Sequence, residues 1–580
     1  MHRTVIRRAL ILTLKPSLKP NPSSVASIPS TGFPRSNKYS RRWVTYDRPP
    51  PVLGAFPSQH DTIYALSSAA GKAGIAVIRI SGPSALQIYH ELCPQKKAPK
   101  SRYATVRSLY LPGSGGAEML DSSALVLYFP GPQTVTGDDV LELHVHGGSA
   151  TVKAVLSAIP RCASSGHVRY AEPGEFTKRA FLNDRLDLAQ VEALSETLAA
   201  ETEQQRRAAV RGSSGSLGRT YEEWRQNLLE ARAEMEALID FQEDQHFDES
   251  PASLVTNVSL QVTEILRSIA THEMASQRTE LLRNGIQVAL LGPPNAGKSS
   301  LMNQIVGREA SIVSGESGTT RDIIEANLDI RGYLCTFADT AGFRSTTAID
   351  PASTARAEDN KVGEVEEEGI RRARVKATQS DVIVVLSSVE KGTTGKFGIR
   401  YDLETLKLAA ACEQRLVLVN KVDAVSEADL RPLIQDFQDT ILKQIPGLET
   451  AVPLPISCKQ AQSQASDQQD PGGVRLVADK LVSAFQRMTS LPASLQDLHG
   501  VTERQRQLLV LCRNSLEDYK EVVGDFQEGD GEAAHDIDLT MAAEHLRYAA
   551  SCLGRITGRG EAGDVEEILG VIFEKFCVGK

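Results

Sequence analysis

One octapeptide near the middle of the chain restricts its fold more than any other sequence feature. Gly292-Pro-Pro-Asn-Ala-Gly-Lys-Ser299 follows an apolar run and precedes the helical pattern 300–306. Between a strand and a helix, such a loop surrounds phosphates with backbone N–H groups, while the lysine reaches the β- and γ-phosphates and the serine binds Mg²⁺. A plain glycine turn before a helix is the alternative. The context favours a P-loop on an α/β domain.

Four later motifs favour GTP as the nucleotide. Asp339-Thr-Ala-Gly342 ends a predicted strand, so its carboxylate can hold Mg²⁺ through water and its glycine amide can meet a γ-phosphate. Asn420-Lys-Val-Asp423 ends another, and its aspartate can accept hydrogen bonds from N1–H and the 2-amino group of guanine, which adenine lacks. Ser457-Cys-Lys459 can close over the base, and Gly318-Thr-Thr320 supplies hydroxyls that sense the γ-phosphate.

These motifs give a set of predicted nucleotide-binding residues. Within the set, Ser299 and Thr320 are the predicted Mg²⁺ ligands. The full set is Gly292, Asn295, Ala296, Gly297, Lys298, Ser299, Ser300, Gly318, Thr319, Thr320, Asp339, Thr340, Ala341, Gly342, Asn420, Lys421, Asp423, Ser457, Cys458 and Lys459.

The residue after Gly342 bears on the mechanism of hydrolysis. It is Phe343, whereas Ras-like proteins have there the glutamine that orients the attacking water. Phenylalanine has no group that can orient water. Hydrolysis must therefore use another carboxylate or a group supplied in trans, or else be slow.

Hydrophobic spacing divides the 580 residues, too many for one core, into regions. Short β-like runs between about 61 and 170, such as 75–80 and 124–129, predict a small α+β domain. Helical spacing follows from about 181 and returns after 491. Between these stretches, strand runs alternate with helical runs, which predicts βαβ units and a parallel sheet. We interpret the α/β unit as inserted into a helical domain; two separate helical domains would give the same pattern.

The first 46 residues differ from the rest in charge. Nine of the 64 Lys and Arg residues, but none of the 73 Asp and Glu residues, lie between Met1 and Tyr46. A basic amphipathic opening before a Ser- and Pro-rich stretch is typical of a mitochondrial transit peptide, with an anion-binding basic tail as the alternative. The remaining acidic chain argues against non-specific coating of nucleic acid. Eight cysteines without a Cys-x-x-Cys pair favour a reducing compartment.

Further stretches of the chain match one family. They are Asp61-Thr-Ile, Ile78-Arg-Ile-Ser-Gly82, Phe129-Pro-Gly-Pro132, Thr136-Gly-Asp-Asp-Val-Leu-Glu-Leu143, His146-Gly-Gly148, Pro173-Gly-Glu-Phe-Thr177, Arg179-Ala-Phe-Leu-Asn183, Leu186-Asp-Leu-Ala-Gln190 and the terminal Phe576-Cys-Val-Gly-Lys580. With them, almost everything after about Asp61 resembles the MnmE family of tRNA-modification GTPases in its mitochondrial form.

The resemblance implies a multidomain α/β and α+β protein. Its domains would be an N-terminal α+β folate-binding-like domain, an all-α helical domain and an inserted P-loop GTPase α/β domain, here called the G domain. Applied to this chain, the implied division is a transit peptide at 1–46, the N-terminal and dimerisation domain at 58–177, a first helical segment at 178–284, the G domain at 285–487, and a second helical segment with the Cys-x-Gly-Lys motif at 488–580.

The resemblance also implies an activity. A homodimeric GTP hydrolase in the mitochondrial matrix, without integral membrane association, would work with an FAD-dependent MnmG-type partner. Together they would modify C5 of the wobble uridine of mitochondrial tRNA, in the carboxymethylaminomethyl or taurinomethyl type, with 5-formyl- or 5,10-methylene-tetrahydrofolate as one-carbon donor. K⁺-dependent G-domain dimerisation would drive hydrolysis. The alternative is a GTP-gated RNA-binding or ribosome-assembly factor of Era-like type, because such factors share the GTPase motifs.

For hydrolysis, the resemblance implies a potassium site and a residue that orients water. Asn295 of the P-loop, with Ser314, Glu316 and Thr319, would hold K⁺, and Ser314 would also belong to the nucleotide site. The ion would neutralise charge on the phosphates as an arginine finger does elsewhere. Glu366 would orient the water. Because the segment after Gly342 looks longer than usual in the family, 364 and 367 are alternatives, and a solvated helix face is the plain explanation of this acidic run.

For folate, the resemblance implies Arg79, Glu142, Arg185 and Lys580. A carboxylate can accept from the amide and amino edges of a pterin, and basic groups suit a glutamate tail. Arg185 stands where the family commonly has lysine, which changes the donor geometry. Cys577 would lie near this site as a candidate catalytic residue, with an inert tail cysteine as the alternative. For His144 and His146 we favour polar contacts over a metal site, since no third ligand is nearby.

Overall fold

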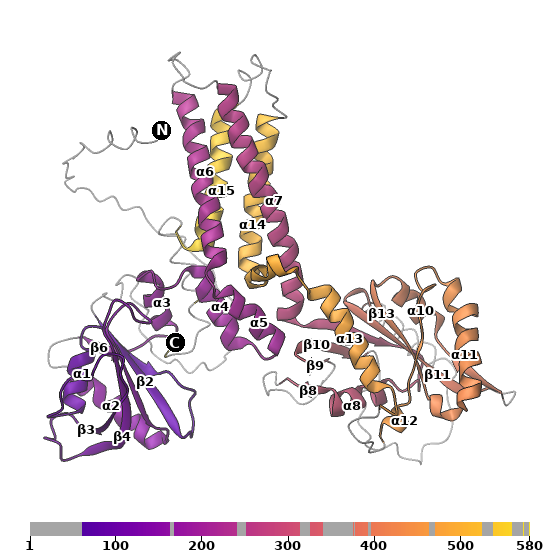
Figure 1. Cartoon of the computed structure of the whole chain (residues 1–580), viewed down its shortest axis with the longest axis horizontal. Helices are drawn as coiled ribbons and strands as arrows, with labels where there is room; N and C mark the ends of the chain where they lie inside the picture. Colours follow the sequence, from indigo (N-terminus) through magenta and orange to yellow (C-terminus); the bar gives the residue numbers. More distant parts are fainter. Residues whose placement is uncertain are drawn as a thin grey trace, which may run out of the picture. The chain divides into compact units, whose positions relative to one another are not determined.

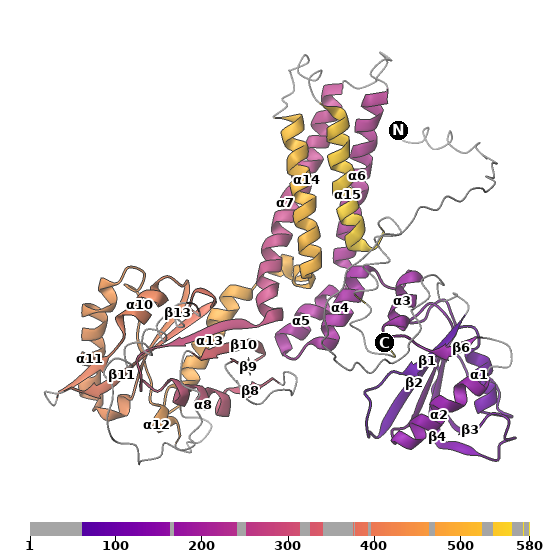
Figure 2. The same cartoon turned by 180° about the vertical axis from the view of Figure 1, so that it is seen from behind.

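The computed structural model describes residues 61–162, 167–240, 251–313, 325–339, 375, 377–392, 396–462, 470–524, 538–559, 572 and 579 (Figures 1 and 2). The predicted transit peptide at 1–46 lies outside these ranges. Within them, no helix is both long and apolar enough to cross a membrane. The multidomain fold class expected from the sequence is confirmed.

The N-terminal domain is an α+β layer of strands and helices. In its described residues, six strands lie in the order β3-β4-β5-β2-β1-β6. Side chains alternate along these strands: Ile78 and Ile80 are buried with the helices, while Arg79 lies on the opposite, half-open face. The elements are β1 (Thr62–Leu66), β2 (Ile75–Ser81), α1 (Ala85–Leu92), β3 (Thr105–Tyr110), β4 (Met119–Phe129), β5 (Val140–His146), α2 (Ser149–Ala158), the 3₁₀ helix η2 (Ile159–Cys162) and β6 (Val168–Tyr170).

A bundle of long helices forms the helical domain, and its core combines two distant stretches of sequence. Leu228 and Val262 from the first stretch are buried in one cluster with Leu516 and Leu546 from the second. This shared core confirms one helical domain interrupted by an insertion, rather than two separate domains. Figures 1 and 2 both show α6, α7, α14 and α15 running side by side. The elements are α3 (Glu175–Leu182), α4 (Leu188–Ala199), α5 (Glu203–Gly212), α6 (Ser216–Asp240), α7 (Pro251–Asn284), η5 (Ala493–Gly500), α14 (Glu503–Val523) and α15 (Leu539–Thr557).

A buried carboxylate joins the two stretches of the helical domain. Glu192 on α4 accepts from Arg504 Nε at 2.5 Å, Gln505 Nε2 at 2.6 Å and Thr502 Oγ1 at 3.1 Å. Arg504 also donates to the carbonyl of Arg555 at the end of α15 at 3.0 Å. A buried charge is tolerated when its oxygens are satisfied in this way, and removing one partner is costly. These contacts therefore fix α4 against both helices that follow the insertion.

The G domain is built on a mixed sheet. Its described strands follow the order β14-β13-β11-β7-β10-β9-β8, with β12 on β11. β14, β13, β11, β7 and β10 run parallel, as predicted, whereas β9, β8 and β12 pair antiparallel to their neighbours. The elements are β7 (Ile286–Leu291), α8 (Lys298–Arg308), β8 (Ala310–Ile312), β9 (Glu325–Ile330), β10 (Tyr333–Asp339), β11 (Val382–Lys391), β12 (Phe397–Arg400), α10 (Leu403–Ala410), β13 (Gln414–Asn420), η3 (Val422–Ala424), α11 (Glu427–Thr440), η4 (Leu442–Gln444), β14 (Leu454–Pro455), α12 (Cys458–Ala461) and α13 (Val474–Thr489).

A tight hairpin explains why the sheet is mixed, whereas the sequence predicted a parallel sheet. Arg331 and Gly332 join β9 to β10, and their φ angles of 50° and 90° are left-handed, as a two-residue hairpin turn requires. So short a connection cannot carry a parallel crossover. The same turn contacts the helical domain, because the backbone N–H of Gln204, in the first turn of α5, donates to the carbonyl of Gly332 at 3.0 Å.

A buried histidine should make the helical domain sensitive to acid. His272 on α7 is 7% exposed, packs against Trp224 and lies with Nδ1 3.1 Å from the Tyr221 hydroxyl. Burial lowers the pKa of His272 from 6.5 to about 4, so between these values only the unfolded chain takes the proton. The buried, neutral His272 therefore makes its full contribution to stability above about pH 6.5. As the pH falls toward 4 this contribution is lost, and the free energy of unfolding decreases by at most about 3 kcal/mol.

Urea unfolding at pH 7.5 and pH 5 checks this expectation. Trp43 is replaced by phenylalanine so that the fluorescence reports on Trp224. His272→Gln should lower the free energy of unfolding at pH 7.5 but shrink the difference between the two pH values by about 2 kcal/mol. His90→Gln, an exposed change in α1, is the control and should leave that difference unaltered. An equal pH difference in wild type and His272→Gln would contradict the assignment.

Candidate functional site

The loop between β7 and α8 has the backbone that a phosphate-binding loop needs. Gly292 and Gly297 have φ angles of 145° and 102°, and Asn295 has 65°. A Cβ at Gly292 would lie 2.2 Å from the Leu386 carbonyl oxygen, so no larger residue fits there. Helix α8 begins directly at Lys298, which leaves its first N–H groups facing the loop.

Lys298 lies across this loop. Its Nζ donates to the carbonyls of Gly292 at 2.8 Å and Pro293 at 3.1 Å. An ammonium group held at the mouth of a ring of N–H donors adds full positive charge to a site already suited to anions. Ser299 and Ser300 follow in the first turn of α8, where a serine hydroxyl suits a hard cation such as Mg²⁺.

Asn420 joins three of the predicted motifs by hydrogen bonds. Its Nδ2 donates to the carbonyl of Ala296 in the loop at 2.8 Å, and its Oδ1 accepts from the N–H of Cys458 at 3.2 Å. The side chain is buried, and a Cβ at Gly297 would lie 2.2 Å from its Nδ2. The sequence predicted Asn420 as a nucleotide-binding residue. In the structure its side chain connects the phosphate-binding loop to the base-recognition motifs by hydrogen bonds.

The base-recognition motifs lie together at the carboxyl ends of β13 and β14. The Ser457 hydroxyl donates to Asp423 Oδ1 at 2.6 Å and also accepts from the N–H of Gln460, which caps α12. This orients the carboxylate that is predicted to read guanine. Lys459 lies within α12, directly after the serine that caps this short helix.

The remaining nucleotide residues are only partly described. Asp339 ends β10 and is paired in register with Leu290 of β7, which brings it beside the start of the phosphate-binding loop. The other predicted residues lie outside the described ranges: Ser314, Glu316, Gly318, Thr319, Thr320, Thr340, Ala341, Gly342 and Glu366.

One contact beside the nucleotide site could not be predicted from the sequence. Lys421 of the Asn-Lys-Val-Asp motif donates to Glu390 Oε1 at 2.8 Å. Glu390 follows a strand run and carries no motif of its own, so only the pairing of β11 with β13 brings it into position. A close opposite charge of this kind has no signal in a single sequence.

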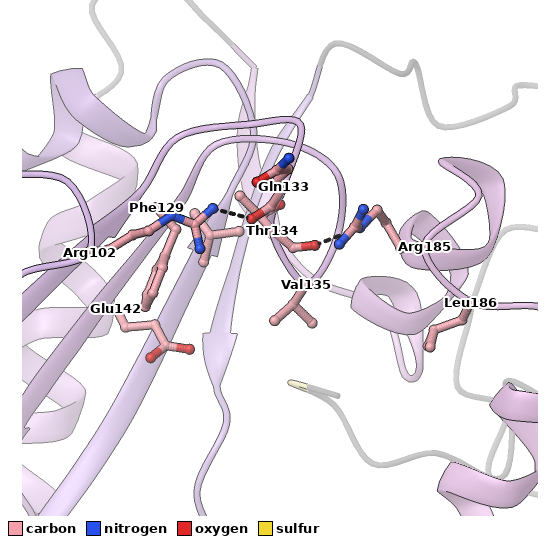
Figure 3. A pocket seen from close by; sticks show the side chains of 9 residues that line it. Arg102, Phe129, Gln133, Thr134, Val135, Glu142, Arg185 and Leu186 are labelled. Carbon is pink, nitrogen blue, oxygen red and sulfur yellow. Dashed lines mark hydrogen bonds between the residues drawn. The ribbon is translucent and has the colours of Figure 1, made fainter. Parts of the chain in front are cut away.

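A second site is a cavity of about 450 Å³ in the N-terminal domain (Figure 3). Glu142 on β5 and Arg185, which follows α3, both line it. Glu142 also pairs across the sheet with Arg79, whose Nε lies 3.0 Å from Oε1. The structure thus brings three of the four predicted folate residues together. The lining is Arg102, Phe129, Gln133, Thr134, Val135, Val140, Glu142, Arg185 and Leu186.

Local capping holds the Arg185 side of this cavity. Asp187 accepts from the N–H of Gln190 at 2.7 Å while Gln190 Oε1 accepts from the N–H of Asp187 at 3.0 Å, a capping box that starts α4. Arg185 Nε donates to the carbonyl of Thr134 at 3.0 Å. Arg185 and Leu186, which line the cavity, are thus anchored directly before the capped start of α4.

The end of the chain reaches the same domain. The Gly579 carbonyl accepts from the Ser67 hydroxyl at 2.8 Å, and a Cβ at Gly579 would lie 2.1 Å from the Leu66 carbonyl oxygen. Leu66 pairs with Ile78, the neighbour of Arg79 on β2. The predicted residues Cys577 and Lys580 flank this contact in sequence and lie outside the described ranges.

The two histidines of β5 lie beside carboxylates. His146 Nδ1 lies 2.9 Å from Asp121 Oδ1, and His144 Nε2 lies 3.5 Å from Glu142 Oε2. Over the residues that the structure describes, no group of three or more His, Cys, Asp or Glu residues is placed to hold a metal. His146 makes the kind of polar contact that the sequence favoured, whereas the buried Nε2 of His144 has no hydrogen-bond partner in the described part of the chain.

The fold and the first site together define a P-loop GTPase. A phosphate-binding loop precedes α8, and it is hydrogen-bonded to a guanine-type Asn-Lys-x-Asp motif on a sheet with a parallel centre. Two family models match the chain: the GTP-binding protein TrmE N-terminus over residues 62–185 and the MnmE helical domain over residues 188–577.

Three relatives extend the match to nearly the whole chain. "tRNA modification GTPase MnmE" of Parvibaculum lavamentivorans is 38% identical over 90% of this chain and 100% of its own length. "5-taurinomethyluridine-[tRNA] synthase subunit GTPB3, mitochondrial" of Danio rerio is 36% identical over 90% and 93%. "tRNA modification GTPase MSS1, mitochondrial" of Saccharomyces cerevisiae is 34% identical over 90% and 94%. The chain belongs to the MnmE family of tRNA-modification GTPases.

Proposed function

We propose that this chain hydrolyses GTP in order to modify C5 of the wobble uridine of mitochondrial tRNA, in the carboxymethylaminomethyl or taurinomethyl type. An FAD-dependent MnmG-type protein is the proposed partner. The observation that carries the proposal is the pairing, in one chain, of a GTPase site with an N-terminal cavity that holds Glu142 and Arg185. An Era-like assembly factor would have no use for that cavity. The names of relatives support tRNA as substrate, and two of them support mitochondria; the proposed location is the matrix.

The proposed nucleotide site uses the residues predicted from the motifs. Lys298 and the N–H groups of the loop would bind the phosphates, and Asp423, oriented by Ser457, would accept from guanine. Ser299 and Thr320 would ligate Mg²⁺, which would neutralise phosphate charge. The described members fit this chemistry, since Ser299 lies in the first turn of α8 at the edge of the loop.

The proposed hydrolysis needs two copies of the chain. Phe343 stands where a water-orienting group would be, so Glu366 is proposed as that group and K⁺ as the balancing charge. Asn295, Ser314, Glu316 and Thr319 would hold the ion in a homodimer.

The proposed ligand of the N-terminal cavity is a reduced folate, 5-formyl- or 5,10-methylene-tetrahydrofolate. Phe129, Val135 and Leu186 supply apolar surface for a flat ring, and Glu142 can accept from its amino and amide edge. Arg185 on the cavity wall suits a carboxylate tail. Cys577 and Lys580 are proposed to join this site, supported by the contact of Gly579 with Ser67 after β1.

The residue boundaries of the domains are proposals as well. We propose a transit peptide at 1–46, an N-terminal domain at 58–177, helical segments at 178–284 and 488–580, and a G domain at 285–487. The shared core of the helical segments supports the two inner boundaries. Arg185, which lines the N-terminal cavity, lies in the first helical segment by this division.

The modification itself is tested by mass spectrometry of wobble nucleosides from mitochondrial tRNA. Cells lacking the protein should lose the C5 adduct, and the wild-type chain should restore it. A Lys298→Ala variant should not, because the phosphates lose their ammonium partner. Intact adducts in cells without the protein would favour the Era-like alternative.

Potassium dependence is tested by GTP turnover in KCl and in NaCl at equal ionic strength. Turnover should fall by about tenfold or more in NaCl, because the transition state loses a charge that stabilises it. Glu366→Ala should abolish turnover in both salts while GTP binding persists. Equal rates in the two salts would count against the potassium site.

Folate binding is tested by titrating 5-formyl-tetrahydrofolate into the full-length chain by calorimetry. Glu142→Gln should weaken binding by about tenfold, because hydrogen bonds to a charged acceptor are worth about 1.5–3 kcal/mol. Glu118→Gln removes the same charge from an exposed position of this domain and should leave the affinity unchanged. Identical affinities for wild type and Glu142→Gln would remove Glu142 from the site.

A further inference from the structure

Glu390 lies where an extension of β11 passes the nucleotide site. β11 continues beyond the level at which Ser388 pairs with Asn420 of β13. β12 then returns antiparallel, with Arg400 opposite Ser388. Residues two apart on a strand share a face, so Ser388 and Glu390 point to the same side, beside the Asn-Lys-Val-Asp motif.

The Glu390 carboxylate makes three polar contacts at this point. Oε1 accepts from Lys421 Nζ at 2.8 Å and from the Ser388 hydroxyl at 2.9 Å, and Oε2 accepts from Arg400 at 3.2 Å. The Lys421 hydrogen bond is the main reason why the pKa of Glu390 is lowered to about 2. The carboxylate is therefore ionised at neutral pH, as its contact with Lys421 requires.

The backbone around Lys421 is already fixed by other contacts. Its φ of 62° is left-handed, which is uncommon for a residue with a side chain. Asn420 on one side is tied to the loop at Ala296, and the N–H of Val422 on the other side donates to the Ile456 carbonyl at 3.3 Å. The direction of the Lys421 side chain is thus the remaining freedom, and the hydrogen bond to Glu390 restrains it.

The ion pair between Glu390 and Lys421 affects where the lysine ammonium lies when a nucleotide is bound. An unpaired ammonium near a triphosphate is drawn toward the phosphates, where Lys298 already lies. Pairing with Glu390 cancels that pull and keeps the ammonium on the base side of the motif. The methylene stem of Lys421 can then cover apolar surface while its charged end stays at the rim. A side chain ordered before binding loses less entropy when the ligand arrives.

We propose that Glu390 is a positioning residue for guanine-nucleotide binding, which acts by holding Lys421 against the base side of the site. The proposal rests on the proposed nucleotide site and deepens it. The β11–β12 extension carries no nucleotide motif, but by this proposal it contributes to the affinity for guanosine di- and triphosphates.

A double-mutant cycle tests the proposal through the dissociation constant for fluorescent GDP. Glu390→Gln keeps the shape but loses the charge, and it should weaken binding about fivefold in the wild-type background. In a Lys421→Met background the same change should weaken binding less than about twofold, because the partner is gone. The fivefold effect should also shrink in high salt, since both groups are partly exposed.

Controls separate this proposal from simpler explanations. Glu427→Gln removes an exposed carboxylate from α11 of the same domain and should leave the affinity unchanged. Equal losses in the wild-type and Lys421→Met backgrounds would indicate a merely structural role and overturn the proposal, as would unchanged or tighter binding in Glu390→Gln. A wild-type chain that bound no GDP would instead contradict the proposed nucleotide site.

Discussion

The geometry of the nucleotide site depends on the buried amide of Asn420. Its two ends bond to the loop at Ala296 and to the N–H of Cys458, so segments far apart in sequence share one planar group. A buried amide is stable only when both ends are satisfied, which makes the three segments mutually dependent. The amide of Asn420 occupies the space that a Cβ at position 297 would need, so only glycine fits there. The phosphate-binding and base-reading halves therefore form one rigid unit.

Much of this G domain could be predicted from sequence because its signals are local. The strand before Gly292, the helix after Lys298 and the motifs at strand ends follow from short patterns, and the structure places them as expected. The antiparallel β9 was missed, although Arg331-Gly332 is a recognisable hairpin turn, because alternating strands and helices favoured a parallel sheet. Glu390 could not be found, since its role comes only from tertiary pairing.

In the other two domains, too, only part of the structure could be predicted from the sequence. Glu142 and Arg185 were expected from resemblance to a family, but Arg102 and Val135, which complete the cavity wall, come from connections with no periodic pattern. Helical spacing before and after the insertion was compatible with one domain or two. The buried cluster that unites residues such as Leu228 and Leu546 resolves this, because a shared core is a property of the folded chain and not of either segment.

The turn at Gly332 has a mechanical consequence. Its carbonyl accepts from the amide of Gln204 at the open start of α5, and the two strands that it joins lead, in sequence, to Thr320 on one side and Asp339 on the other. A shift of this hairpin by one residue along its neighbour would leave the helix start without an acceptor. The hairpin that connects the two phosphate-sensing motifs in sequence is therefore tied to the first turn of α5 by a hydrogen bond.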